Sequence, residues 1–264
     1  MTDPTRKRRF CVASEDDACA SAAEPARGGP AFAPGQRLVL PPAEAHHAAH
    51  VLRLRPGDAV ELFDGSGGTA GARLVEVRRG AVTALVEEVC APLARPAPIL
   101  HLAFAVPKGR RLDWLLEKAT ELGAASLVPI RFERSVAGGD ALSAAQRRRW
   151  TARCIAAAKQ AGLDFLPAIG RPMTLDAYAV GPRTGLGLFG DLSDDARPLW
   201  AAVADRAAAP PIYNVVVGPE GGLTPAEGQA LRRAGFRPVR LGHTVLRIET
   251  AAVALLAGLL SLQP

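Results

Sequence analysis

The sequence is poor in cysteine and in long apolar runs, and each shortage excludes a class of protein. Its four cysteines, Cys11, Cys19, Cys90 and Cys154, are widely spaced and form no CxxC pair. Neither a zinc site nor a disulfide framework is therefore indicated, and we expect reduced thiols. The longest apolar stretch, Thr250–Leu262, covers about 13 residues, whereas a membrane-spanning helix needs roughly 20. These absences predict a cytoplasmic protein with no membrane segment.

No cleavable leader is recognisable near the start of the chain. The basic cluster Arg6–Arg9 resembles the first part of a signal peptide, but Glu15, Asp16 and Asp17 interrupt the apolar run that should come after it. The composition also argues against disorder, because 48% of the 264 residues are hydrophobic and a chain of this length can bury a core. One large domain or two modest ones are expected.

Positive charge is in excess and comes almost entirely from arginine. The chain has 32 Lys and Arg residues against 26 Asp and Glu residues, a formal net charge of +6. Because the planar guanidinium pairs bidentately with phosphate, an arginine-rich surface favours a nucleic-acid partner. A genome composition that favours arginine and alanine explains the same excess, so charge alone leaves both interpretations open.

Residues 1–95 predict a small β domain. Short runs of strand-forming residues are separated by turn signals, and one helix is expected at Pro42–Leu52. The segments Leu74–Val77 and Val82–Leu85 predict a hairpin. Short strands at such regular spacing are typical of a small barrel. The other expected strands of this part are 37–40 and 59–63.

After a proline-rich linker at Pro92–Pro98, residues 96–264 alternate between predicted strands and helices. Leu112–Leu122 has apolar residues at helical spacing and is followed by Gly123, and Ser143 with Gln146 forms a capping box for a helix that runs to about Gly162. Such alternation predicts a mostly parallel sheet covered by helices, hence an α/β fold. The expected strands are 99–106, 126–132, 165–169, 185–189, 212–217 and 237–241.

The strongest local signal is a glycine-rich loop between an apolar strand and a helix. The strand Val215–Val217 is followed by Gly218–Gly222, then by Thr224 as a helix N-cap with Glu227 completing a capping box. Open α/β sheets bind ligands at the carboxyl ends of their strands, and glycines let a ligand approach the backbone. No Lys-Ser/Thr comes after the glycines, so the loop is not a P-loop. A tight strand-to-helix turn is the plain alternative.

A second loop of the same kind comes after the next predicted strand. Residues 237–241 lead into Gly242–Thr250 and then into a long apolar helix. Two loops with a glycine at the strand end, at one edge of a sheet, would form the wall of a pocket. The apolar helix after the second loop is either part of the core or a dimer face.

The residues of the two loops, 218–224 and 241–251, resemble the signature pair of the bacterial 16S rRNA (uracil-N3)-methyltransferases, a family within the SPOUT superfamily. The resemblance extends from about Arg9 to Leu260 and keeps the order of the family's motifs. The other segments that match the family's motifs are Arg9-Phe10, His50–Asp58, Leu62–Gly65, Lys108-Gly109, Glu117–Gly123 and Glu133–Ser135.

This resemblance implies a PUA-like β-barrel that binds RNA at residues 1–95 and a SPOUT methyltransferase domain with a C-terminal trefoil knot at 96–264. Knots are too rare to be expected from sequence physics alone. The family binds S-adenosyl-L-methionine in the knot loops, works as a homodimer, and methylates N3 of one uridine in the decoding region of 16S rRNA. S-adenosyl-L-methionine is thus the expected cofactor, and 16S rRNA or the small ribosomal subunit is the expected partner.

The chemistry of this reaction suggests catalytic and RNA-binding residues, and the resemblance implies the cofactor contacts. Because N3 of uracil must lose a proton, a cation beside the uracil oxygens and a proton acceptor are needed. Arg247 is the candidate cation and Glu249 the candidate acceptor; helix capping and pairing within the loop are equally good roles for both. RNA contacts are expected at Arg9, His50, Arg53, Lys108 and Arg134, because phosphate binding needs dispersed cations. The cofactor contacts are expected at Leu188, Gly218, Pro219, Glu220, Gly222, Leu241, Gly242, Val245 and Leu246.

Two segments depart from the family's pattern. Lys159–Leu163 occupies the place where members commonly carry Glu-Gln-Cys-Gly-Arg, so the arginine that would make one RNA or active-site contact is not expected here. Ser14–Pro34 is longer and looser than expected and predicts a mobile loop.

Other interpretations of the chain stay open at this point. His46, His47 and His50 are close enough in sequence to suggest a metal, but they have no carboxylate or cysteine partner nearby, so histidines facing solvent or RNA are favoured and no metal is expected. A SPOUT enzyme that acts on another RNA, or a ribosome-assembly factor that binds RNA without catalysis, are the alternatives to the rRNA methyltransferase.

Overall fold

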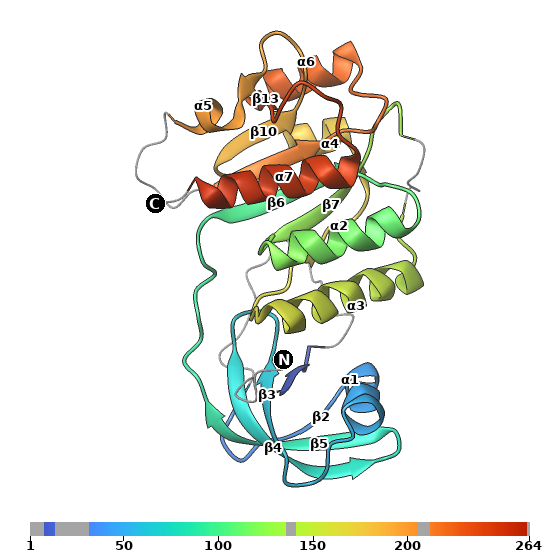
Figure 1. Ribbon diagram of the computed structural model, residues 1–264, viewed down its shortest axis with the longest axis vertical. Helices are drawn as coiled ribbons and strands as arrows, with labels where there is room; N and C mark the ends of the chain where they lie inside the picture. Colours follow the sequence, from blue (N-terminus) through green and yellow to red (C-terminus); the bar gives the residue numbers. More distant parts are fainter. Residues whose placement is uncertain (1–7, 14–31, 136–140, 205–211, 263–264) are drawn as a thin grey trace. The chain divides into compact units, whose positions relative to one another are not determined.

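The computed structural model describes residues 8–13, 32–135, 141–204 and 212–262 (Figure 1). Residues 14–31 of the expected mobile loop, and with them Cys19, lie outside the described residues. At the end of that segment, Phe32 is described and is buried in a hydrophobic core.

Packing contacts divide the chain into two compact units. The first contains the described residues up to Arg95 together with Ala158–Leu166, and the second contains Pro96–Ala157 and the described residues from Pro167 onward. The division between Arg95 and Pro96 falls within the proline-rich linker. The segment Ala158–Leu166 makes its contacts in the first unit, although a simple boundary at residue 95 would leave it in the second.

The first unit is built on a five-stranded sheet in the order β1-β3-β4-β5-β2. Strands β1 and β3 are parallel, and the other neighbours are antiparallel. The predicted hairpin is confirmed as β4 and β5, joined by a turn in which Gly80 has a φ of 86°. The bounds of the strands are β1 Arg8–Cys11, β2 Arg37–Val39, β3 Ala59–Phe63, β4 Thr69–Arg78 and β5 Ala81–Val89.

One side of this sheet faces the core of the unit. In β5 the buried residues Val82, Ala84 and Val86 alternate with more exposed ones, as expected for a strand with one buried face. The predicted helix is confirmed as α1 (Pro42–His46), which continues as a single π-helical turn, η1 (His47–Val51). Its alanines pack against the buried face of the sheet, so the core lies between sheet and helix.

The second unit contains the expected parallel sheet, in the order β11-β13-β10-β12-β6-β7-β8, with β9 pairing to β7. Its neighbouring strands pair in parallel throughout. The central strands are nearly continuous apolar runs because helices cover both of their faces. The bounds are β6 Ile99–Ala105, β7 Ser126–Arg131, β8 Ala168–Ile169, β9 Met173–Thr174, β10 Leu186–Gly190, β11 Arg197–Pro198, β12 Ile212–Val217 and β13 Arg237–Arg240.

One predicted strand is largely wrong. The segment 165–169 forms a strand only at β8, and Phe165 instead makes an isolated bridge with Ser66 in the first unit. Pro167 explains the difference, because proline has no backbone N–H and cannot donate to a strand ladder. The hydrophobic run is real, but its first half belongs to the first unit and only its second half joins the parallel sheet.

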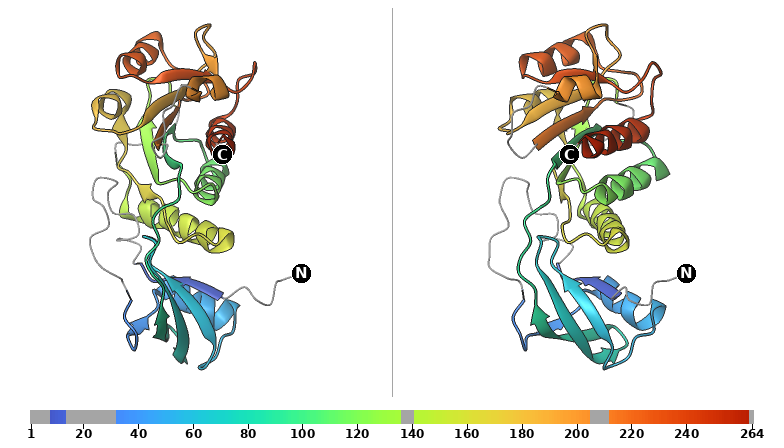
Figure 2. Two further views of the ribbon diagram at one scale, coloured as in Figure 1. Left: turned by 90° about the vertical axis from the view of Figure 1, so that its left-hand side faces the viewer. Right: turned by 60° about the vertical axis from the view of Figure 1, so that its left-hand side comes forward.

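Helices cover both faces of the sheet (Figure 2). Helix α7 packs on β6 and β12 and contacts α2 and α5, whereas α4 contacts α6, β7 and β9. Figures 1 and 2 show α2, α3 and α7 on one face and α4 and α6 on the other. The predicted capping box of α3 is confirmed, with Ser143 and Gln146 bonded reciprocally. The bounds are α2 Arg110–Glu121, α3 Ala144–Ala161, α4 Leu175–Val180, α5 Leu199–Val203, α6 Pro225–Arg233 and α7 Ile248–Ser261.

The C-terminal part of the chain takes an unusual path through this sheet. After β12 the chain crosses through α6 to β13, which lies beyond β10, so the crossover passes over one strand. It then returns through residues 241–247 to α7, which packs back on β12 and β6. Both of the loops singled out in the sequence belong to this path.

Candidate cofactor and RNA site

The candidate site lies where three neighbouring parallel strands of the second unit end. Strand β10 lies between β12 and β13. Because Phe189 pairs with Val216 and Gly190 pairs with Val239, the chain leaves the three strands at nearly the same level. The structure therefore brings the two glycine-containing loops together at the carboxyl edge of the sheet, on either side of the end of β10. Ligands of open α/β sheets bind at this edge.

The loop after β12 is held firmly at its far end. The expected capping box of α6 is present: the Glu227 backbone N–H donates to Thr224 Oγ1 over 3.3 Å, and the Thr224 N–H donates to Glu227 Oε2 over 2.8 Å. The other oxygen of Glu227 accepts the backbone N–H of Glu133 over 2.8 Å. Gly222 has a φ of 72°, a left-handed conformation that favours glycine. These contacts hold the backbone of the loop in one conformation, so it can form one wall of a ligand site without rearranging.

Two arginines bind residues 220 and 221 of the same loop. Arg134 Nη1 donates to the carbonyl oxygen of Gly221 over 2.9 Å, and Arg111 Nη1 donates to Glu220 Oε1 over 3.0 Å. Pro219 is buried, whereas Glu220 and Gly222 are exposed or partly exposed. Arg134, expected to contact RNA, therefore also supports the backbone of the candidate cofactor loop.

The loop after β13 exposes apolar side chains. Leu241 is 39% exposed and Val245 is 74% exposed, and Leu246 is partly buried. A Cβ added at Gly242 would meet no atom of the described residues within 4 Å, and the φ of Gly242 is not in the left-handed region. Exposed apolar side chains beside open space at a strand end are typical of a ligand site. Exposed apolar side chains of this kind can pack against the apolar face of a ligand, so the residues present are compatible with the expected cofactor.

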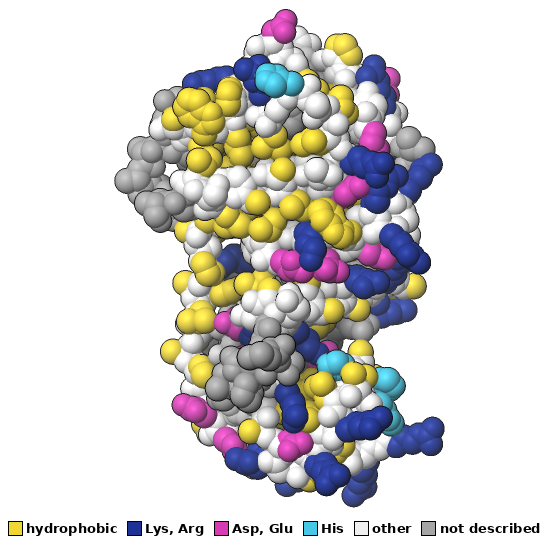
Figure 3. Space-filling view, in the orientation of Figure 1, with side chains coloured by type: hydrophobic (Ala, Val, Ile, Leu, Met, Phe, Trp, Pro, Cys, Tyr) yellow, Lys and Arg dark blue, Asp and Glu magenta, His cyan; other side chains and the backbone are white. Residues whose placement is uncertain are grey.

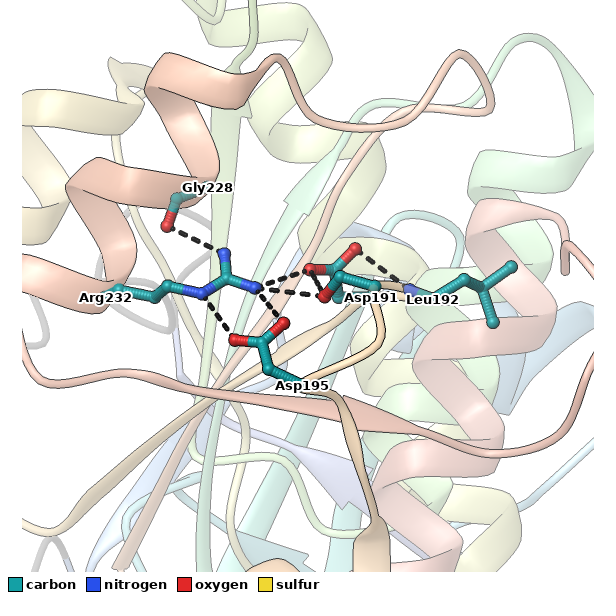
Figure 4. A network of polar contacts seen from close by, with 6 residues as sticks. Asp191, Leu192, Asp195, Gly228 and Arg232 are labelled. Atoms are coloured by element: carbon teal, nitrogen blue, oxygen red, sulfur yellow. Dashed lines mark hydrogen bonds and ion pairs between the residues drawn. The ribbon is translucent and has the colours of Figure 1, made fainter.

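The end of β10 is pinned to α6 by a charged network (Figure 4). Arg232 reaches both Asp195 oxygens over 2.9 and 2.8 Å and Asp191 Oδ2 over 3.1 Å, and its Nη1 donates to the Gly228 carbonyl. The hydrogen bonds from Arg232 hold the pKa of Asp195 well below its usual range. By contrast, the predicted contact residue Leu188 is fully buried two residues before the strand end.

A cavity of about 230 Å³ opens next to the loop after β12. It combines two cations with one carboxylate and lies at the beginning of α7, where Ile248 contributes to its wall. We call it the reaction pocket. Its lining residues are Ala105, Val106, Lys108, Arg111, Ser135, Pro219, Glu220 and Ile248.

The two candidate catalytic residues flank Ile248. Arg247 is exposed and occupies the N-cap position of α7, without a side-chain capping bond. Glu249 is 8% exposed in the first turn of that helix, and its Oε2 accepts no hydrogen bond from the described residues. A helix N-terminus favours a carboxylate electrostatically. A buried carboxylate oxygen without a donor is costly, which makes Glu249 a candidate for a role beyond packing.

The candidate RNA contacts fall in both units. Lys108 is exposed and lines the reaction pocket. His50 and Arg53 are exposed in the first unit, and Arg53 has a φ of 53°, a costly backbone conformation for a residue other than glycine. Figure 3 shows histidine and arginine or lysine side chains together on the visible face of the first unit.

Arg9 differs from the other candidate RNA contacts. Its side chain is only 8% exposed, pairs with Asp164, and places Nε 2.6 Å from Glu61 Oε1. Its guanidinium also lies 4.9 Å from the centre of the Phe63 ring. These contacts give Arg9 a structural role within the first unit, and the phosphate contacts are better sought among the exposed cations.

The departing segment Lys159–Leu163 also has a structural role in the first unit. Lys159 Nζ donates to both oxygens of Glu44, over 2.9 and 2.8 Å, and the Leu163 carbonyl accepts Arg9 Nη1 over 3.3 Å. Sequence reasoning missed this pair because its members are distant in the chain. It also missed Arg111 as a partner of the glycine-rich loop and Asp191 at the end of β10.

Neither a metal cluster nor a membrane segment is found in the described part of the chain. No three side chains of His, Cys, Asp or Glu gather there as metal ligands, although the rings of His46 and His50 lie 4.9 Å apart. None of the helices described there combines the length and apolarity needed to cross a bilayer.

Comparison with known proteins identifies the family. Residues 95–260 match the family of RNA methyltransferase domains, and residues 40–87 match the RNA methyltransferase PUA domain. Similar proteins include the ribosomal RNA small subunit methyltransferase E of Mycobacterium bovis, 34% identical over 81% of this chain and 82% of that protein. The protein of the same name from Synechocystis is 32% identical over 83% of this chain and 71% of its own length.

Two solved structures resemble this chain over almost its whole length. A putative methyltransferase of Legionella pneumophila, in complex with the cofactor SAM, is 28% identical with a TM-score of 0.81. A ribosomal RNA small subunit methyltransferase E of Neisseria gonorrhoeae, bound to S-adenosyl methionine, is 28% identical with a TM-score of 0.77. Both alignments cover 97% of this chain and 98% of the other. The chain belongs to the RNA methyltransferase family that includes the bacterial ribosomal RNA small subunit methyltransferases E.

Proposed function

We propose that the protein transfers a methyl group from S-adenosyl-L-methionine to N3 of one uridine in the decoding region of 16S rRNA. The observation that carries this proposal is the pair of loops at the carboxyl ends of β12 and β13, in a fold shared with methyltransferases that bind this cofactor. The names of the relatives support the small-subunit rRNA as substrate. Because ribosomal subunits lie in the cytoplasm, we place the reaction there.

The proposal includes the finer description of the fold. The first unit would be a PUA-like barrel closed around its core, and the second a SPOUT domain with a trefoil knot. The crossover that passes over β10 and the return of the chain to α7 support a knot, because a chain end that returns past an earlier crossover can pass through it. The match of residues 40–87 to the PUA domain supports the first assignment.

The cofactor would be held mainly by the backbone of the two loops. Gly218 and Gly222 allow close approach on one side, and Leu241, Gly242 and Val245 offer exposed apolar surface on the other. When bound, this cofactor supplies a methyl group activated by a positively charged sulfur. The remaining expected contacts of this site are Leu188, Pro219, Glu220 and Leu246.

The chain's own residues would prepare the uracil for attack. The N3–H proton would pass to the Glu249 carboxylate, directly or through water, and the guanidinium of Arg247 would stabilise the negative charge that develops on the uracil oxygens. Together these two residues would leave N3 without its proton and ready to accept the methyl group that the bound cofactor supplies. The reaction needs N3, carbon and sulfur in line, so the pocket's main task is positioning.

Contacts with the RNA would come from dispersed cations of both units. Lys108 and Arg134 lie beside the reaction pocket and its loop, and His50 and Arg53 are exposed in the PUA-like unit. Such phosphate contacts position the RNA without reading its sequence.

A homodimer is the proposed assembly. Helix α7 is apolar around its whole circumference except at Glu249, Thr250 and Ser261, and Figure 3 shows hydrophobic side chains gathered over it. Trp200, in the neighbouring helix α5, is 65% exposed. A helix that is apolar on all sides needs a cover on the side that faces away from its own sheet, and a second copy of this chain provides one.

The proposal is tested by nucleoside mass spectrometry of 16S rRNA from cells with and without the gene. Loss of 3-methyluridine, restored by the wild-type gene, is the expected result. Gly242→Trp should fold, because the site is open around Gly242, yet fail to restore the nucleoside, whereas Gly242→Ala should restore it. Unchanged 3-methyluridine refutes the named substrate. A cofactor-induced rise in melting temperature then indicates an enzyme for another RNA, and its absence a non-catalytic RNA-binding factor.

A further inference from the structure

A second cavity, here called the side pocket, lies next to the reaction pocket in the second unit. Its volume is about 330 Å³, at the lower end of the roughly 300–1,000 Å³ that is usual for small-molecule sites. Val106 and Lys108 line both cavities, so the connection between β6 and α2 forms the wall between them. An RNA strand with one nucleotide in the reaction pocket would therefore pass close to the side pocket.

The inner walls of the side pocket are apolar and rigid. Ile130 is 1% exposed and Trp150 is 4% exposed, so both are fixed in the core. Three proline rings, from Pro107, Pro129 and Pro172, add flat apolar faces that cannot change their backbone angle. The apolar side chains of the wall make no hydrogen bonds with water. A flat ring that enters this space therefore breaks no such bonds on the side of the wall.

The rim of the side pocket is cationic. The exposed side chains of Lys108 and Arg149 and the partly buried Arg131 belong to the lining of the pocket, and its described lining contains no carboxylate. Arg149 Nη2 donates a hydrogen bond to Asp113 Oδ2 over 2.6 Å. The Arg149 side chain is nevertheless 63% exposed, so it can also reach a phosphate. An apolar interior with a cationic rim is complementary to a nucleobase attached to a phosphodiester.

One hydrogen-bond donor at the rim is available. The side-chain oxygen of Gln146 accepts the backbone N–H of Ser143 over 2.9 Å as part of the α3 capping box. Its amide nitrogen has no partner among the described residues, and Gln146 belongs to the lining of the pocket. An amide N–H can donate to the carbonyl oxygen or ring nitrogen on the edge of a base.

We propose that the side pocket binds the nucleobase of the nucleotide next to the methylated uridine, with Lys108 on the phosphate between the two nucleotides. The inference rests on the proposed function, and deepens it by naming a specificity subsite. An enzyme that takes one base out of its stack also unstacks its neighbour, and contacts to that neighbour select the sequence around the target. Pro219 and Glu220 of the glycine-rich loop line the reaction pocket but not the side pocket, so a base in the side pocket would leave that loop free.

The first test uses Gln146→Glu in the full-length protein. A glutamate still accepts the Ser143 N–H, and an acidic residue suits the first turn of a helix, so α3 should stay intact. The variant removes the amide donor and places a negative charge at the rim. Gln229→Glu, on an exposed position of α6 outside both cavities, is the control with the same chemical change. Leu142→Trp is a second variant, which fills the pocket.

Binding of a synthetic single-stranded RNA with the decoding-region sequence is measured by fluorescence anisotropy. We expect Gln146→Glu and Leu142→Trp each to raise the Kd about tenfold, the size of one lost base contact, and Gln229→Glu to leave it unchanged. Affinity for S-adenosyl-L-methionine, measured by calorimetry, should be the same in all four proteins. An unchanged RNA Kd in both pocket variants overturns the proposal, even if the protein methylates the RNA.

A substrate change completes the test. RNAs with an abasic residue directly 5′ or directly 3′ of the methylated uridine are compared with the intact RNA. The wild-type protein should bind one of the two abasic RNAs about tenfold more weakly than it binds the intact RNA. Leu142→Trp should bind that abasic RNA and the intact RNA with equal affinity, because the filled pocket no longer uses that base. Equal losses in both proteins refute the subsite. Weaker binding by both pocket variants without any methylation would retain the subsite and refute the proposed function.

Discussion

The ion pair between Glu44 and Lys159 should be the most sensitive polar contact of the first unit. Both oxygens of Glu44 accept from Lys159 Nζ, and Oε2 also accepts the backbone N–H of Cys11 over 3.2 Å. The side chains are only 11% and 16% exposed, and Nζ lies 5.1 Å from the centre of the Phe10 ring. Lys159→Met removes the cation at nearly constant volume and leaves the carboxylate buried.

The size of the effect can be worked out from this burial. Breaking a buried ion pair from one side costs about 3 to 5 kcal/mol, because the remaining charge loses its partner without regaining water. The double variant Lys159→Met with Glu44→Gln removes both charges and keeps an oxygen for the Cys11 N–H. Its cost should fall to about 1 to 2 kcal/mol, the value of the lost neutral hydrogen bonds. The two substitutions should therefore be strongly non-additive.

The assay must report on the first unit alone. The three tryptophans, Trp114, Trp150 and Trp200, all lie in the second unit, so their fluorescence would track the wrong transition. Hydrogen exchange of the β4 and β5 amides, measured by mass spectrometry through a urea series, gives the opening free energy of this sheet. Arg73→Met, which breaks the exposed pair with Glu87, is the control and should change little. A loss below about 1 kcal/mol for Lys159→Met, or a double variant no more stable than the single one, would refute the reasoning.

Three further predictions concern the second unit and the thiols. Thr224→Ala should lower the stability of the second unit by about 1 kcal/mol in urea denaturation, because it removes the N-cap of α6; no loss would mean that the box is redundant. Because Arg232 depresses the pKa of Asp195 below its usual 3.8, the stability from this pair is present above about pH 4 and lost as the pH falls further. Arg232→Met should flatten the acid limb of a pH series of melting temperatures, and an unaltered limb would contradict this. Burial raises the pKa of the Cys11 thiol to about 12, so iodoacetamide at pH 8 should modify the exposed Cys90 and spare Cys11, as peptide mass spectrometry can check.

Local patterns in the sequence were sufficient to predict the elements whose causes are local. Strand β12 covers the predicted range 212–217, in which Asn214 is the one residue that is not hydrophobic, and the capping boxes of α3 and α6 form between the predicted residues. Each of these signals is contained within a few consecutive residues. The hairpin of β4 and β5 was predictable for the same reason, since its turn glycine and its alternating burial are both local.

The features that the sequence could not predict depend on residues that are distant in the chain. Nothing in the local sequence of Lys159 indicates that Glu44 will be its partner, and Phe165 gives a strand signal although its bridge partner is Ser66, about a hundred residues earlier. The same holds for the site. The glycine-rich loop is recognisable from its own residues, but its supports, Arg111 and Arg134, come from α2 and from the segment after β7.

These supports decide how the candidate RNA residues can be tested. Arg134 holds the Gly221 carbonyl, so its removal would weaken cofactor binding and RNA binding together and could not separate the two. Lys108 is exposed at the boundary of both cavities and makes no hydrogen bond or ion pair among the described residues. A loss of RNA affinity in Lys108→Met at unchanged cofactor affinity would therefore report a phosphate contact directly. The burial and pairing of Arg9 likewise mean that a defect in Arg9→Ala reports first on the fold of its own unit.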